Sequence, residues 1–280
     1  MTYETLIEPA GLRQHLGDPA WSIVDCRFDL AQTEAGRQAY QQAHIPRAHY
    51  AHLDEDLSSP ITPTSGRHPL PDIQRLAARL GEWGISSATQ VIAYDNANGA
   101  FAARLWWLLR WLGHRPVAVL NGGLQAWLAA GYPTESRPAA VMRAEFKPQP
   151  QNDAWLTTAQ VQQKLASGEI TLIDARAADR FAGRNETIDS IAGHVPGARN
   201  HPFVSDLDSQ QRFLPAAQLR QRWLEESRGP DAGHVVCMCG SGVTACHNLL
   251  ALEVAGLHGA RLYAGSWSEW IRDPNRPIVA

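Results

Sequence analysis

Short apolar segments alternate along the chain with longer segments in which apolar residues recur at helical spacing. The short segments are rich in β-branched residues, as buried strands are, and the longer ones have the period of amphipathic helices. Trp21 to Phe28 and Thr171 to Arg176 are each expected to form a strand followed by a polar turn. Further strands are expected at Gln90 to Asp95 and Val235 to Cys239, and helices at Asp72 to Gly84, Ala100 to Gly113, Thr158 to Ser167, Ala216 to Glu226 and Ala245 to Gly256. Strands that alternate with helices predict an α/β fold with parallel sheets flanked by helices.

The same series of landmarks occurs twice, which indicates an internal repeat. In each half, a strand that ends near an aspartate is followed by a His-x-Pro turn, a second strand, and a glycine turn with a tryptophan. The matching turns are His44-Ile45-Pro46 with His194-Val195-Pro196, and Asn121-Gly122-Gly123 with Ala264-Gly265-Ser266. A proline-rich polar stretch, about Pro133 to Asp153, reads as a linker. We therefore expect two domains, residues 1–140 and 154–280.

Composition narrows the class of protein. At 280 residues, with 44% hydrophobic and 19% charged residues, the chain is typical of a folded protein large enough for two domains. A net charge of −3 gives no reason to expect a nucleic-acid or membrane partner. Residues Met1 to Thr5 have no apolar core, so we expect no signal peptide. Four cysteines without a secretory signal favour free thiols in the cytoplasm.

The most informative segment is the loop that begins at Cys239. It lies between an expected strand end and an expected helix start, and it carries Gly240 and Gly242. Such a loop turns backbone N–H groups and the positive end of a helix toward one point, where they stabilise a thiolate or a bound anion. The alternative is a small buried thiol, the interpretation we give to Cys26, Cys237 and Cys246.

Four observations limit what this loop does. The residue six positions after Cys239 is Ala245, so the arginine that clamps phosphate in a Cys-x5-Arg phosphatase is missing. No Gly-Lys-Ser/Thr sequence follows, which excludes a nucleotide P-loop. Cys237 and Cys239 are a poor zinc site, because the sequence has no second pair of ligands at the required spacing. Aligning the two halves places Asp95 opposite Cys239. The first domain is then expected to lack the nucleophile, with an aspartate that would repel an anion.

The sequence resembles tandem-domain sulfurtransferases of the rhodanese superfamily. The resemblance rests on the two His-x-Pro turns, on Cys239-Gly240-Ser241-Gly242-Val243-Thr244-Ala245 and on Tyr263 to Trp270. The resemblance implies an inactive N-terminal and a catalytic C-terminal rhodanese-like domain, and a persulfide on Cys239. It implies a small-molecule sulfur donor, no metal or organic cofactor, and cyanide, a small thiol or a thioredoxin-like protein as acceptor. An alternative of another class is a non-catalytic module that holds an anion or a partner.

The resemblance also bears on the donor. The Gly240-Ser241-Gly242 sequence is similar to that of enzymes that use 3-mercaptopyruvate; thiosulfate, with the same mechanism, is the alternative. Arg180 matches the family's first carboxylate-binding arginine, whereas Asp189 stands where the second is expected, and Arg184 is a nearby substitute. The loop residues expected to contact the donor are Gly240, Gly242, Val243 and Thr244, with hydroxyl donors from Ser241 and Thr244.

A Ser–His–acid relay, as some members of the superfamily use, would pair Ser241 with His44 here, with Asp29 or Glu34 as the acid. The competing interpretation is that His44 and His194 each cap a turn before a buried strand. For Arg180 the competing interpretation is an exposed surface charge. Structural roles are expected for Arg176 with Asp174, for Glu269 in the closing turn, and for the cluster of Trp106, Trp107 and Trp111.

Overall fold

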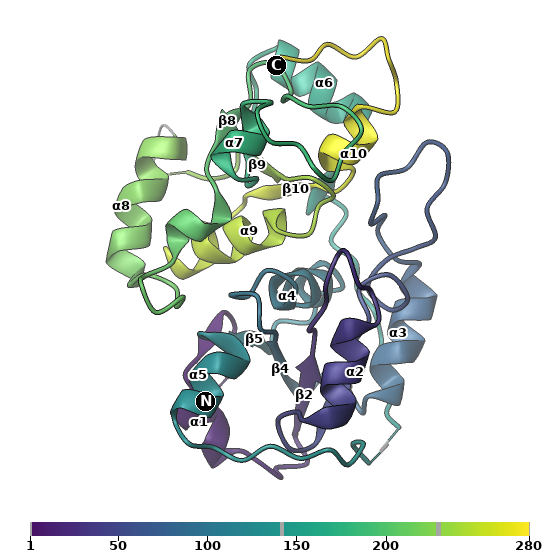
Figure 1. The fold of residues 1–280 in the computed structure, drawn as a ribbon, viewed down its shortest axis with the longest axis vertical. Helices are drawn as coiled ribbons and strands as arrows, with labels where there is room; N and C mark the ends of the chain where they lie inside the picture. Colours follow the sequence, from purple (N-terminus) through teal and green to yellow (C-terminus); the bar gives the residue numbers. More distant parts are fainter. Residues whose placement is uncertain (1, 141–142, 228–230, 280) are drawn as a thin grey trace. The chain divides into compact units, whose positions relative to one another are not determined.

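The computed structural model describes residues 2–140, 143–227 and 231–279, and it divides into two compact units (Figure 1). The first unit, here the first domain, consists of Met1–Ser59 and Leu70–Gln151; the second domain consists of Pro60–Pro69 and Asn152–Ala280. The expected division did not foresee that Pro60–Pro69 packs with the second domain. Residues 141 and 142 of the expected linker lie outside the described residues.

Among the described residues, each domain contains a five-stranded parallel sheet flanked by helices, and the two sheets have the same strand order. This confirms the predicted fold class and the repeat. The first sheet has the order β1-β5-β4-β2-β3 and the second the order β6-β10-β9-β7-β8. The first-domain elements are β1 (Leu6–Ile7), α1 (Pro9–Gln14), β2 (Trp21–Asp25), α2 (Ala35–Gln42), β3 (Ala48–Tyr50), α3 (Ile73–Glu82), β4 (Gln90–Tyr94), α4 (Ala102–Trp111), β5 (Val117–Leu120) and α5 (Gly123–Ala129). The second-domain elements are β6 (Trp155–Leu156), α6 (Thr158–Ala166), β7 (Thr171–Asp174), α7 (Ala178–Phe181), β8 (Arg199–Asn200), the 3-10 helix η1 (Phe203–Asp206), α8 (Ala216–Ser227), β9 (Val235–Met238), α9 (Ala245–Val254), β10 (Arg261–Tyr263) and α10 (Ser266–Trp270).

The predicted helices form within a few residues of the expected bounds because their ends are marked in the sequence. Asp72 caps α3, its carboxylate accepting the N–H of Arg75 at 2.9 Å. Thr157 and Gln160 form a capping box at the start of α6. Helix α9 is apolar on most of its surface and is buried from Ala245 to Leu252, so it lies inside the second domain against β9 and β10. This buried strand–helix pair provides a rigid support for the loop between them.

Each domain also repeats a buried ion pair at the end of its first long strand. Arg27 pairs with Asp25 and donates to the carbonyl oxygen of Ala43 at 2.7 Å. In the second domain Arg176 pairs with Asp174 at 2.8 Å in the same way and lies 4.8 Å from the Trp267 ring centroid. These contacts confirm the structural role predicted for Arg176, because both members of the pair are buried and satisfied.

Other residues expected to be structural are also packed. Trp107 and Trp111 stack with ring centroids 5.8 Å apart, and Trp106 donates to the carbonyl oxygen of Glu4 at 2.8 Å. Glu269 accepts a hydrogen bond from the Thr158 hydroxyl within the second domain. Among the described residues, every helix is too short or too polar to cross a membrane.

Asp95 occupies the place that Cys239 has in the second domain, and its own carboxylate fills the loop. Its two oxygens accept the N–H groups of Ala97, Gly99, Phe101 and Ala102 at 2.8 to 2.9 Å. Burial raises the pKa of Asp95, and these four hydrogen bonds act against that rise. The N–H groups of the first-domain loop are therefore occupied by the Asp95 carboxylate itself. From the sequence alone, this aspartate was expected to repel an anion near the loop.

We expect Asp95→Asn to lower the free energy of unfolding of the first domain by about 1–3 kcal/mol. The amide NH₂ would face N–H donors that now meet an oxygen, leaving buried donors unpaired. Urea unfolding of the variant measures the loss. Asp18→Asn is the matched control, because the Asp18 side chain is 37% exposed and accepts one loop N–H, that of Ala20. Equal losses in the two variants would contradict the role assigned to Asp95.

Candidate active site

The loop between β9 and α9 lies where the sequence predicted it (Figure 1). The sulfur of Cys239 accepts the N–H of Gly242 at 3.1 Å, and the residue is 2% exposed. Gly242 has a φ of 79°, and a Cβ at this position would lie 2.4 Å from the carbonyl oxygen of Ala264. A side chain at position 242 would meet both backbone strain and a backbone clash. The N–H donor to the sulfur therefore depends on glycine at this position.

The turn at the start of α10 holds the loop through backbone hydrogen bonds. The N–H of Cys239 donates to the Ser266 hydroxyl at 3.1 Å. The N–H groups of Trp267 and Ser268 donate to the carbonyl oxygens of Cys239 and Gly240 at 3.0 and 2.8 Å. The two most distinctive motifs of the sequence thus form one hydrogen-bonded unit, which fixes the backbone around the thiol.

The remaining loop residues differ in their surroundings. Val243 is buried, and Thr244 stands at the N-cap of α9 without a side-chain capping hydrogen bond. Cys246 contacts the carbonyl oxygen of Gly242 at 3.4 Å from within α9. Burial raises the pKa of the Cys26 and Cys237 thiols well above the usual value. These three cysteines are packed, as predicted, and Cys239 is the one that lies in the loop.

The segment Pro60–Pro69 supplies side chains to the second domain from the N-terminal half of the sequence. The N–H of Arg67 donates to the Ser268 hydroxyl at 3.0 Å. Arg272 donates to the carbonyl oxygen of Ser65 at 3.1 Å. The segment is therefore bound to the turn that holds the Cys239 loop, although it lies about two hundred residues earlier in the chain.

This segment corrects one predicted contact. Nδ1 of His68 lies 2.7 Å from the hydroxyl oxygen of Ser241, and both residues are buried. The predicted partner, His44, is engaged within the first domain, where its ring nitrogens lie 2.6 and 3.1 Å from the carbonyl oxygens of Tyr40 and Arg137. His44 also stacks on Tyr40, so it has the capping role given as the competing interpretation. The histidine that the structure brings to Ser241 is His68.

His194 makes the equivalent contact in the second domain. Its Nδ1 lies 2.8 Å from the carbonyl oxygen of Phe181, and the two rings stack 3.9 Å apart. The turn histidine is therefore a repeated structural feature, which explains why the His-x-Pro sequence occurs in both halves.

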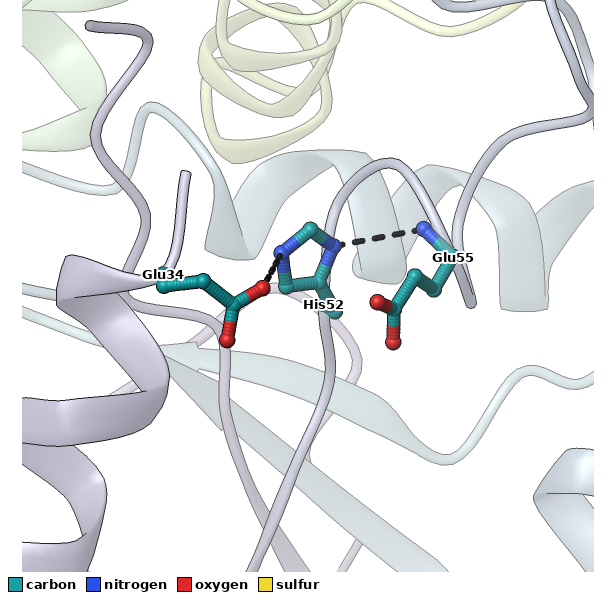
Figure 2. A group of neighbouring side chains, drawn as sticks. All are labelled: Glu34, His52 and Glu55. Carbon is teal, nitrogen blue, oxygen red and sulfur yellow. Dashed lines mark hydrogen bonds and ion pairs between the residues drawn. The ribbon is translucent and has the colours of Figure 1, made fainter. Parts of the chain in front are cut away.

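The two acids considered for the relay are also engaged elsewhere. Asp29 accepts the N–H groups of two residues in its own turn, at 2.7 and 2.9 Å. Glu34 lies beside His52 and Glu55 in a group with the spacing of a metal site (Figure 2). Arg37 already bridges both carboxylates, at 2.9 and 2.5 Å, so a guanidinium takes the place of a cation. We assign no metal to this group.

Beside the Cys239 loop, two arginines face two carboxylates. Arg180 forms a bidentate pair with Glu186 and contacts Asp189 at 3.1 Å. The other oxygen of Asp189 pairs with Arg67. A Cβ placed on Gly240 would lie 2.8 Å from Nη2 of Arg67 and 3.6 Å from Nη2 of Arg180. Arg180 is thus at the loop and not a free surface charge, and two guanidinium groups stand next to the residue that follows Cys239.

A family model described as a rhodanese-like domain matches residues 8–130 and 157–273, one match in each domain. The chain belongs to the rhodanese family. The matched ranges contain both strand–loop–helix frames described above, including the Asp95 loop and the Cys239 loop.

Individual rhodanese relatives cover almost all of the chain. It is 47% identical over 281 residues to a Pseudomonas aeruginosa protein named "Probable 3-mercaptopyruvate sulfurtransferase", covering 100% of this chain and 99% of that protein. It is 34% identical to the thiosulfate sulfurtransferase of Cricetulus griseus, covering 90% and 85% of the two chains. The solved structure of 3-mercaptopyruvate sulfurtransferase from Leishmania major matches with a TM-score of 0.85 at 33% identity, covering 95% of this chain and 74% of that one. The chain is therefore a sulfurtransferase enzyme.

Two residues that the structure places at the Cys239 loop, Arg67 and His68, were not predicted from the sequence. Arg184 was predicted as the second arginine, but Arg184 is exposed and Arg67 lies at the loop. One signal was available: residues 51–72, between β3 and α3, form a long connection without a regular helix or strand. Connections of that length inside a compact domain often carry function.

Proposed function

We propose that the chain transfers a sulfane sulfur from a small anionic donor, with 3-mercaptopyruvate favoured over thiosulfate, through a persulfide on Cys239 to a thiophilic acceptor. The observation that carries this proposal is the Cys239 sulfur with its N–H donor from Gly242, beside the Ser241–His68 pair. A fixed N–H donor stabilises the thiolate before the reaction and the charged terminal sulfur after it.

In the first half-reaction the Cys239 thiolate attacks the outer sulfur of the donor. A bond forms between the cysteine sulfur and the outer sulfur, and the bond from the outer sulfur to the rest of the donor breaks. The electron pair of that bond leaves with the donor, as the enolate of pyruvate from 3-mercaptopyruvate or as sulfite from thiosulfate. Arg180, beside Gly240, supports binding of the donor's anionic group.

The Ser241–His68 pair favours 3-mercaptopyruvate as donor. An enolate leaving group takes up a proton to become pyruvate, whereas sulfite leaves as a stable anion. A serine hydroxyl hydrogen-bonded to a histidine is a group that can deliver that proton next to the reacting sulfur. The name of the Pseudomonas aeruginosa relative agrees with this preference.

In the second half-reaction an acceptor attacks the terminal sulfur of the persulfide and restores the Cys239 thiolate. Cyanide, a small thiol and a thioredoxin-like protein are acceptors with the required nucleophile. Both steps are displacements at sulfur, so the proposed cycle uses no metal and no organic cofactor. The four cysteines are buried and none forms a disulfide, which supports a reducing compartment such as the cytoplasm.

The test compares the two donors on the wild-type enzyme. We expect kcat/KM for 3-mercaptopyruvate to exceed that for thiosulfate by roughly 10-fold or more. Mass spectrometry after incubation with donor alone should show about 32 Da added to the peptide that contains Cys239. A preference for thiosulfate would overturn the donor assignment. Absence of both the mass increase and turnover would overturn the proposed function and favour a binding module.

A further inference from the structure

We propose that Arg67 binds the anionic group of the sulfur donor, and that Asp189 holds its guanidinium next to the Cys239 loop. This inference rests on the proposed function. Sulfur donors of the proposed class end in an oxyanion, a carboxylate in 3-mercaptopyruvate or a sulfonate in thiosulfate. A planar guanidinium with paired N–H donors matches either group.

Placement supports this role for Arg67. A Cβ on Gly240 would lie 2.8 Å from Nη2 of Arg67, which is the nearest atom outside residues 239–241. Glycine at position 240 therefore leaves room for the arginine to approach the loop backbone directly after Cys239. Arg67 is itself fixed at both ends, because its N–H donates to the Ser268 hydroxyl and its Nη1 pairs with Asp189.

The two arginines differ in how many of their side-chain nitrogens are engaged: two in Arg180 and one in Arg67. Arg180 uses Nε and Nη2 on Glu186, and Nη2 also contacts Asp189. Arg67 uses Nη1 alone, and within the described residues its Nε and Nη2 have no hydrogen-bond partner. The Arg67 side chain remains 23% exposed, whereas that of Asp189 is 4% exposed. Arg67 thus keeps Nη2 next to the loop without a hydrogen-bond partner among the described residues, and the buried Asp189 carboxylate holds the guanidinium through Nη1.

Electrostatics agree with this geometry. Burial lowers the pKa of the Arg67 guanidinium, and the nearby Cys239 sulfur opposes that change. The charges of the two arginines are balanced by those of Glu186 and Asp189. An anion is therefore held through directed N–H donors more than through excess positive charge, a mode suited to a small donor that must be oriented.

The test measures the two half-reactions of the Arg67→Gln variant separately. In a double-displacement cycle, kcat/KM for the donor reports sulfur loading, and kcat/KM for cyanide, measured with excess donor, reports unloading. We expect donor kcat/KM to fall about 10- to 100-fold for 3-mercaptopyruvate, for thiosulfate or for both, with cyanide kcat/KM changed less than about 3-fold. The donor with the larger loss identifies the oxyanion that Arg67 contacts. Arg67→Lys keeps the positive charge but loses the paired N–H donors of the guanidinium. Its donor kcat/KM should lie between those of the wild type and Arg67→Gln.

Arg222→Gln is the matched control, because Arg222 is an exposed arginine of α8 in the same domain. Unchanged donor kcat/KM in Arg67→Gln would overturn the inference, as would equal losses for donor and cyanide, which indicate a damaged loop. A donor loss in Arg184→Gln but not in Arg67→Gln would assign the role to Arg184 instead. If the wild-type enzyme formed no persulfide, the proposed function itself would be contradicted. If Arg67→Gln formed the persulfide with normal donor kinetics, only the role of Arg67 would be contradicted.

Discussion

Cys239→Ser should abolish sulfur transfer, lowering kcat/KM for any donor by at least about 10⁴-fold. A serine hydroxyl occupies nearly the same volume. The hydrogen bond from the Cys239 N–H to the Ser266 hydroxyl and those from the N–H groups of Trp267 and Ser268 to the loop carbonyl oxygens do not depend on the sulfur. The fold of the second domain is therefore retained, while the atom that forms the new bond to sulfur is lost. The measurements are steady-state kinetics with cyanide as acceptor and the mass of the donor-treated protein.

Cys26→Ser is the matched control for this variant. Cys26 and Cys239 are buried to the same degree, 1% and 2% exposed, but Cys26 lies after β2 in the first domain and contacts a carbonyl oxygen there. The control should keep its turnover and its mass increase of about 32 Da on the Cys239 peptide. Full turnover by Cys239→Ser would move the sulfur carrier to another residue and overturn the mechanism proposed here.

Local patterns were enough to predict the frame of this site. The apolar run from Val235 and the glycines after Cys239 specify a strand, a tight loop and a helix, and all three form. Such signals work because each depends on residues near in sequence, where period and turn chemistry determine the backbone. The agreement is therefore best at β9 and α9, whose contacts are mostly with the core of one domain.

The Ser241 partner could not be predicted in the same way. His68 and Ser241 are 173 positions apart, and Arg67 and Ser268 are 201 apart. No periodicity connects such residues, and the contact exists because Pro60–Pro69 belongs to the second domain. The choice of His44 followed the more conspicuous His-x-Pro sequence. The occurrence of that sequence in both halves was itself a sign of a structural role, because the half without a nucleophile carries it too.

His68→Asn should separate the two donors. Asparagine can keep a hydrogen bond to the Ser241 hydroxyl, but it cannot take up and release a proton near neutral pH. We expect kcat/KM for 3-mercaptopyruvate to fall about 10²- to 10³-fold, since the enolate leaving group then lacks its proton source. Thiosulfate should lose less than about 10-fold, because sulfite leaves without a proton and the Cys239 loop is unchanged.

Ser241→Ala removes the other member of the Ser241–His68 pair. If Ser241 and His68 act as one unit, each single variant removes the whole contribution, and the double variant should be little worse than either. Additive losses would instead mean two independent roles. An equal loss for both donors in His68→Asn would show that the histidine holds the loop in shape and does not move a proton. The donor ratio therefore decides between a proton-transfer and a structural role for the 2.7 Å contact, and it does so without any assumption about which donor the cell supplies.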